Sequence, residues 1–158
     1  MKKIFIALSM MVIPLTAHAQ SGGEQVVQDA ANDLKPAFCE NSIPNAIKIV
    51  ENCYANVDAD SAHEKMNQCI IEDMTVVFTI KQKQQQYLNN YQTDPYSNLD
   101  FMQKQNIMMR QLKHPSFFNS MTETGNTPQA VGEIVMKAYV KIIERLKQEG
   151  CVDLDKLK

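Results

Sequence analysis

The sequence predicts an all-α protein, built as an up-down bundle of four main helices plus a short N-terminal helix and stapled by two disulfides. Three observations lead to this class. Apolar residues recur at spacings of three and four along most of the chain, strand-turn-strand signals and internal repeats are absent, and the four cysteines are spaced for pairing between helices. The chain is also long enough to form one domain with its own core.

The first 19 residues have the pattern of a secretory signal peptide. Two lysines open it, an apolar stretch follows at residues 4–15, and an Ala-His-Ala cleavage motif ends at Ala19. An uncleaved membrane anchor is the alternative, but the apolar stretch is shorter than the roughly 20 residues that span a bilayer. We therefore expect a signal peptide at residues 1–19 and a single helical domain at residues 20–158. The protein should be periplasmic or secreted, bacterial, and without a membrane span after cleavage.

The charge of the chain argues against nucleic acid as a partner. The chain holds 16 Lys and Arg against 18 Asp and Glu, a net charge of −2. These charges are spread along the sequence, so no basic stripe or polybasic segment is available to bind phosphates or lipid headgroups. We expect no nucleic-acid binding.

Two helices are predicted before residue 58. Apolar residues at helical spacing over residues 24–34 predict the short N-terminal helix, which Pro36 should end because proline lacks a backbone N–H. Residues 43–57 repeat apolar side chains at i, i+3, i+4 and i+7, which is one face of an amphipathic helix. Both segments should bury one face.

A long central helix is predicted over residues 62–92. Ser61 and Glu64 form a capping box at its start, since each side chain can accept a hydrogen bond from the backbone N–H of the other. Its middle, residues 74–80, is apolar nearly all round, as expected of a helix with several neighbours. A buried strand is the competing interpretation, because most of these side chains are β-branched or aromatic. The absence of turn residues on either side favours the helix.

Two more helices complete the predicted bundle. The third main helix follows Ser97 and ends before Pro115. The fourth has Thr127 as its N-cap, Pro128 at its first position and Gly150 just past its end. Between them lies a loop rich in Ser, Thr and Asn.

The positions of the cysteines predict how they pair. Cys53 and Cys69 lie at equal distances on either side of Ser61, so an antiparallel hairpin brings them to matching heights, within the roughly 4 Å between Cβ atoms that a disulfide requires. Cys39 precedes the second helix and Cys151 follows the last one, and an up-down topology brings both to one end. We predict the pairs Cys53–Cys69 and Cys39–Cys151, formed in an oxidising compartment.

The spacing of the cysteines fits a metal site or a redox centre less well than it fits two disulfides. A structural zinc site usually shows C-x2-C or H-x3-H, and a redox centre shows a C-x-x-C pair; the sequence has neither. Copper carriers that use methionine tend to repeat Met-x-x-Met or Met-His groups, which are also missing. We expect no metal site and no cofactor.

The sequence names no catalytic group. His63 and His114 lie at a helix start and beside a proline, and the serines occur in caps and loops without a nucleophile motif. Asp73 should point toward the packed stripe of the central helix, where burial would suit a general acid, although pairing with a basic neighbour is the commoner outcome. Glu72 should face solvent. An enzyme is therefore the least favoured class.

Two surfaces are predicted to serve a partner. One is the amide-rich end of the long helix, residues 81–92, and the other is the loop over residues 114–126. Exposed aromatic and methionine side chains there would be binding hot spots, whereas buried ones would only pack against the bundle. The candidate binding residues are Tyr87, Tyr91, Phe117, Phe118 and Met121.

These observations favour a non-catalytic secreted or periplasmic protein that binds another protein of the cell envelope. It would act as an inhibitor or immunity protein, as a chaperone, or as an accessory subunit of an envelope complex. This is a likeness of class and rests on no matched motif. The alternative is a carrier that holds a small apolar ligand between its helices, for which a pocket lined by Met and Phe would be the sign.

Overall fold

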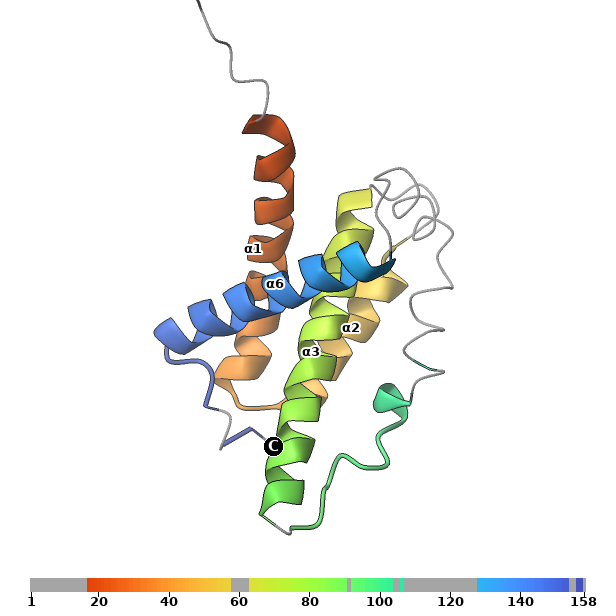
Figure 1. Ribbon diagram of the computed structural model, residues 1–158, viewed down its shortest axis with the longest axis vertical. Coiled ribbons are helices and arrows are strands. Elements are labelled where there is room, and N and C mark those ends of the chain that lie inside the picture. The colour runs from red at the N-terminus through yellow and green to blue at the C-terminus, as the bar shows by residue number, and fades with distance from the viewer. Residues whose placement is uncertain are drawn as a thin grey trace, which may run out of the picture.

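Helices make up the regular structure in the part of the chain that the computed structural model describes. These residues are 17–57, 63–90, 92–103, 106, 128–153 and 156–157, with side chains described except at 17–22, 63 and 128. The elements in chain order are α1 (Ala17–Cys39), α2 (Ile43–Ala55), α3 (His63–Asn89), the 3₁₀ turn η1 (Asp100–Met102) and α6 (Pro128–Gln148). Figure 1 shows α1, α2 and α3 side by side, with α6 crossing α1 and α3. The predicted all-α bundle is confirmed.

α1 is longer than the sequence predicted. It starts at the predicted cleavage motif, runs to Cys39 and contains Pro36, which was expected to end it. A proline inside a helix costs about 3 kcal/mol, and burial of one phenylalanine offsets about 2–3 kcal/mol of that. The two residues after the proline, Ala37 and Phe38, are both buried. Their burial explains why the helix continues through Pro36 and carries Cys39 to its disulfide partner.

Two polar residues set the turn between α1 and α2. Asn41 has a backbone φ of 54°, in the left-handed region that asparagine tolerates better than most residues. Ser42 then caps α2, because its hydroxyl accepts a hydrogen bond from the backbone N–H of Asn45 at 3.3 Å. Pro44 lies in the first turn of α2, where its missing N–H is no loss. The two helices leave this turn in contact with each other.

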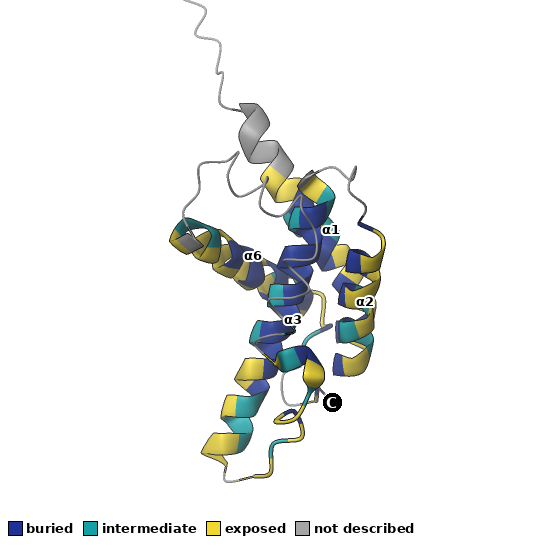
Figure 2. Ribbon diagram, turned by 90° about the vertical axis from the view of Figure 1, so that its right-hand side faces the viewer, coloured by how far each residue is buried: buried dark blue, intermediate teal, exposed yellow. Residues whose placement is uncertain are grey.

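α3 is the central helix of the fold. It contacts α1, α2 and α6, and its middle is buried around most of its circumference (Figure 2). The alternative of a strand over residues 74–80 is wrong, because these residues belong to one continuous helix. Burial against three neighbours decides the conformation, because a β-branched side chain weakens a helix by no more than about 0.7 kcal/mol. Ser61 of the predicted capping box lies outside the described residues.

The segment after α3 folds back along the C-terminal half of that helix. The Tyr96 ring packs edge-to-face on Tyr87 with centroids 6.1 Å apart, and the Tyr96 carbonyl accepts a hydrogen bond from Gln84 Nε2 at 3.1 Å. η1 follows and buries Phe101. The predicted third main helix overlaps the described residues mainly at this turn, and most of it lies outside them.

α6 runs across α1 and α3 instead of parallel to them (Figure 1). Gly150 follows its end with a φ of 73°, as the sequence predicted for a helix-terminating glycine, and the Cys151 N–H donates to the Leu146 carbonyl at 2.8 Å. The side chains that α6 buries are Val135, Ala138, Tyr139, Ile142, Ile143 and Leu146.

Polar contacts join the C-terminal ends of α1 and α6. Lys35 Nζ lies 3.0 Å from Glu149 Oε2, and Arg145 Nε lies 3.1 Å from Glu149 Oε1. Hydrogen bonds from Lys35 and then Arg145 hold the pKa of the Glu149 carboxyl below its ordinary value. Arg145 also donates to Asn32 Oδ1 at 2.8 Å. These groups are exposed, so the contacts orient the two helices more than they stabilise the fold.

Both predicted disulfides are present. Cys53–Cys69 joins α2 to α3, and Cys39–Cys151 joins the end of α1 to the segment after α6. They link residues 16 and 112 positions apart, separations that in the chain-entropy model correspond to about 3 and nearly 5 kcal/mol. Both are compatible with an oxidising compartment. No described helix is long and apolar enough to cross a membrane.

Candidate functional site

A stripe of polar side chains runs along the buried part of α3. Its members recur at spacings of four and three, so they share one side of the helix. Charged residues are almost never fully buried unless they are paired. This stripe is therefore the least expected feature of the described core. Its members are Gln68, Glu72, Thr75, Thr79 and Lys83, each at most 8% exposed.

Glu72 is the centre of a hydrogen-bonded cluster between α1 and α3. Gln68 Nε2 donates to Glu72 Oε1 at 2.8 Å and to Asp33 Oδ2 of α1 at 2.7 Å, so one amide bridges two carboxyl groups. Lys65 Nζ donates to Gln68 Oε1 at 3.3 Å. The second Glu72 oxygen, Oε2, is buried and has no hydrogen-bond partner among the described residues.

Burial raises the pKa of the Glu72 carboxyl from 4.5 to about 8, and the nearby Asp33 carboxylate adds to the rise. The hydrogen bond from Gln68 and the charge of Lys65 oppose it without cancelling it. Most of the Glu72 side chains are therefore protonated at neutral pH. A neutral carboxyl also explains how two carboxyl groups can share one amide without strong repulsion.

The sequence-based expectation that Glu72 faces solvent is wrong: none of its surface is exposed. Adjacent helix residues point about 100° apart, and the sequence pattern assigned only one apolar stripe to the core. α1 and α6 cover a second side of α3, and that side is the polar one. The sequence did carry a signal that this side of α3 is covered. Gln68, Thr75 and Thr79 lie on the same side of the helix as Glu72, and the two threonines are β-branched.

Asp73 is buried, as predicted, on the side of α3 that faces α2. Its Oδ2 accepts a hydrogen bond from Tyr54 Oη at 3.2 Å, so a tyrosine hydroxyl is one of its partners. Tyr54 follows Cys53, and Cys69 lies one helical turn before Asp73. The Cys53–Cys69 disulfide therefore holds the two helices together beside this hydrogen bond.

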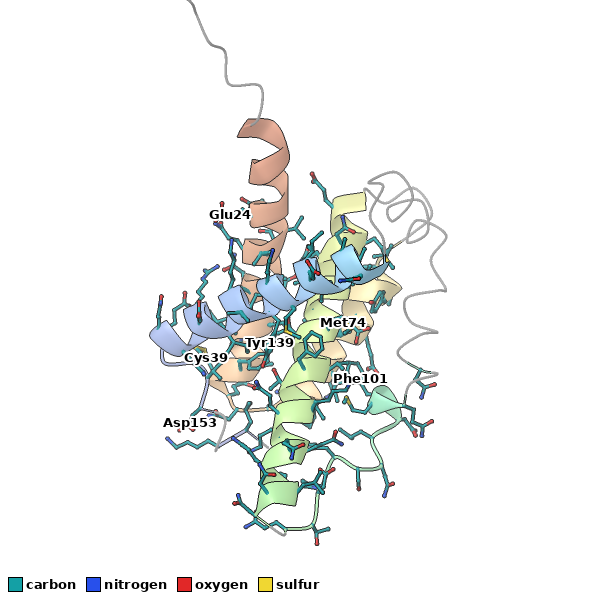
Figure 3. All side chains as sticks on the ribbon, viewed as in Figure 1. Glu24, Cys39, Met74, Phe101, Tyr139 and Asp153 are labelled. Atoms are coloured by element: carbon teal, nitrogen blue, oxygen red, sulfur yellow. A yellow bond between two sulfur atoms is a disulfide. The ribbon has the colours of Figure 1, made fainter. Side chains whose placement is uncertain are left out.

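Tyr139 carries a second buried polar atom without a partner. Its ring lies against Phe78 with centroids 5.4 Å apart, between α6 and α3 (Figure 3). Burial raises the pKa of the Tyr139 hydroxyl, and the nearby Thr79 hydroxyl moderates the rise. Thr79 donates instead to the Thr75 carbonyl at 2.8 Å, and Tyr139 Oη forms no hydrogen bond with any described residue.

Of the predicted partner-binding residues, the structure describes Tyr87. This side chain is half-buried: it packs on Tyr96, and Lys83 Nζ lies 5.5 Å from its ring centroid. Its contacts are those of a packed residue more than of an exposed hot spot. The other four predicted residues, Tyr91, Phe117, Phe118 and Met121, lie outside the described residues.

The exposed apolar side chains are found elsewhere. Met136 and Val140 of α6 are both 44% exposed, Ile134 is 51% exposed, and Leu88 near the end of α3 is 63% exposed. The periodic pattern had grouped Ile134 with the buried face of its helix. Met136 and Val140 are one turn apart and share a side with Gly132, so these three residues form an exposed surface, called here the α6 flank.

No group of three or more His, Cys, Asp or Glu side chains that would hold a metal ion occurs within the described part of the chain. Comparisons with protein-family models, with curated proteins and with solved structures find no match to this chain. A functional interpretation therefore depends on the geometry described above.

Proposed function

We propose that this protein is a non-catalytic protein of a bacterial periplasm that works by binding another protein of the cell envelope. An inhibitor or immunity protein, a chaperone and an accessory subunit of an envelope complex are the three forms of this activity. Two disulfides on a helical fold support the proposal, because crosslinked scaffolds of this kind suit an oxidising compartment and hold a binding surface rigid.

The α6 flank is the observation that carries the proposal. Met136 and Val140 remain 44% exposed although the opposite side of α6 is well packed. The charged residues around them have both signs. An apolar centre with a charged rim is the composition of a protein-binding surface. The rim residues are Glu133, Lys137, Lys141 and Glu144, all exposed.

Affinity capture from the envelope fraction of the producing cell tests this proposal. The bait is the exported chain with both disulfides formed, either unchanged or carrying M136E and V140E together. L88E is the matched control, since it places the same charge on an exposed apolar residue away from α6. All three proteins should keep the same thermal unfolding midpoint, because the changed residues are exposed.

We expect the unchanged chain and the L88E variant to recover the same protein in stoichiometric amount, and the double variant to lose it. Loss of two apolar contacts at an interface centre should weaken binding by about 10- to 100-fold. The proposal is contradicted if the unchanged chain recovers no stoichiometric protein, or if the double variant recovers as much as the control.

A further inference from the structure

We propose that the proton on Glu72 locks α1 onto α3, and that release of this proton frees α1 to swing about its covalently anchored C-terminal end. This inference goes beyond the proposed binding function and does not depend on it. It rests on the bridge between Asp33 and Glu72, on the buried Glu72 Oε2, which has no partner in the described part of the chain, and on the position of the disulfide at one end of α1.

The Asp33–Gln68–Glu72 bridge makes the contact between α1 and α3 depend on whether Glu72 is neutral or ionised. While Glu72 is neutral, Gln68 Nε2 can donate to Asp33 and to Glu72 at once. An ionised Glu72 would place a second negative charge beside Asp33 and leave a charged oxygen buried without a donor, which is among the least favourable arrangements in a protein interior. Opening of α1 exposes Glu72 to water, where the ionised form is favoured.

The charged and titratable groups around Glu72 are few among the described residues. Asp33 faces it from α1 and Lys65 from α3 itself. The titratable group that α6 brings to α3 is Tyr139, which lies at Phe78 and Thr79, about two turns along the helix from Glu72. α2 packs on the side of α3 that carries Asp73, where Tyr54 is the neighbouring titratable group. Among the described residues, Glu72 is thus the buried carboxyl group at the contact between α1 and α3, whereas Glu149, which pairs with Lys35 of α1, is exposed.

The crosslinks determine which part of α1 can move. Cys39 at the end of α1 is bonded to Cys151, and the following turn leads directly into α2. All four cysteines lie at position 39 or beyond, so no disulfide holds the earlier turns of α1. Those turns are held by buried apolar side chains, by the Asp33–Gln68–Glu72 bridge and by the hydrogen bond from Arg145 of α6 to Asn32. The apolar side chains that opening would expose are Val26, Ala30, Ala31 and Leu34.

Hydrogen exchange read by mass spectrometry tests the proposal on the exported chain with both disulfides intact. The opening constant of amides in residues 24–34 is measured from pH 5 to pH 9 and corrected for intrinsic exchange. We expect it to rise about tenfold per pH unit up to pH 8 and to level off above, because opening releases one proton in this range. Amides of α2 should show a smaller dependence on pH, because the Cys53–Cys69 disulfide holds α2 to α3.

Three variants make the result decisive. E72Q keeps a neutral side chain at this position and should make α1 opening independent of pH, while E64Q changes an exposed glutamate of the same helix and should leave the dependence intact. D33N removes the neighbouring charge from an exposed position, so the plateau should begin at lower pH. A flat profile in the unchanged chain, an unaltered slope in E72Q, or an unmoved plateau in D33N would each overturn the proposal.

Discussion

The two sides of α3 can be compared directly, because Asp73 and Glu72 are consecutive residues. On the side that faces α2, the Asp73 carboxylate accepts a hydrogen bond from Tyr54, and the Cys53–Cys69 disulfide ties the two helices together close by. On the side that faces α1, Glu72 has one oxygen bonded to Gln68 and one with no hydrogen-bond partner among the described residues, and no disulfide joins α1 to α3. One side is fixed covalently, and the other is held by a carboxyl group in its neutral form.

This difference shows that a buried carboxyl group can have two opposite consequences in one helix. Where it accepts a hydrogen bond from the neighbouring helix and a disulfide joins the two helices, it adds a fixed polar contact. Where a second carboxylate is the neighbour, its protonation becomes a condition for packing. The stability of this protein should therefore depend on redox state mainly through α2 and the helix ends, and on pH mainly through α1.

Removal of the Cys39–Cys151 disulfide should have the largest effect on stability. The bond links residues 112 positions apart, so the C39S/C151S variant should lose up to about 5 kcal/mol of unfolding free energy in the chain-entropy model. Urea denaturation followed by circular dichroism measures the loss. If this variant loses less unfolding free energy than the variant without the Cys53–Cys69 disulfide, the crosslink at the end of α1 contributes less to stability than its loop length predicts.

Removal of the Cys53–Cys69 disulfide should cost less. The bond links residues 16 positions apart, and the C53S/C69S variant should lose about 3 kcal/mol. Hydrogen exchange compares α2 with α1 in this variant. The amides of α2 should lose more protection than the amides of α1. An equal loss in both helices would mean that the disulfide supports the fold as a whole instead of one side of α3.

The E72Q variant should be more stable than the unchanged chain at pH 7, by about 3 kcal/mol. The folded pKa of Glu72 is raised from 4.5 to about 8, so the unfolded chain binds fewer protons than the folded one between these values. The contribution of Glu72 to stability is thus fully present below pH 4.5 and is lost as the pH rises to about 8.

Urea denaturation at several pH values between 4 and 9 measures this dependence. The unchanged chain should lose unfolding free energy across the range, and the difference between it and E72Q should grow with pH until about pH 8. Equal curves for the two proteins would show that Glu72 titrates alike in the folded and unfolded states.

Loss of the Tyr54 hydroxyl should have the smallest effect. The Y54F variant removes one donor to Asp73 and keeps the ring, so we expect a loss of about 1 kcal/mol. The same denaturation measurement determines it. An unfolding free energy equal to that of the unchanged chain would show that this hydrogen bond adds nothing to stability.

Much of the fold could be predicted from the sequence. The equal spacing of Cys53 and Cys69 about a helix break determined one disulfide, and the other pair followed by elimination and topology. Gly150 marked a helix end correctly, because its conformation there is left-handed. Local patterns succeed where one local physical constraint, such as a cap or a crosslink between adjacent helices, is decisive.

The rest depended on contacts between distant segments. Pro36 did not end α1, because burial of Ala37 and Phe38 offsets most of the local cost. Glu72 did not face solvent, because α1 covers a second side of α3. Hydrophobic periodicity shows which residues share a face of a helix, but it does not show how many faces are covered. The exposure of Met136 and Val140 was not predicted either, because the candidate surfaces were chosen by their aromatic residues, of which Tyr87 packs on Tyr96.

Direct titration of Glu72 is the measurement that tests this account most sharply. The carboxyl carbon of Glu72, identified by its absence from the E72Q spectrum, is followed by carbon-13 NMR in the folded, disulfide-bonded chain. We expect its midpoint at about pH 8, with the resonances of α1 residues shifting in the same titration. A midpoint near 4.5 would contradict the account, because Glu72 would then be ionised in the folded protein and could not hold α1 through its proton.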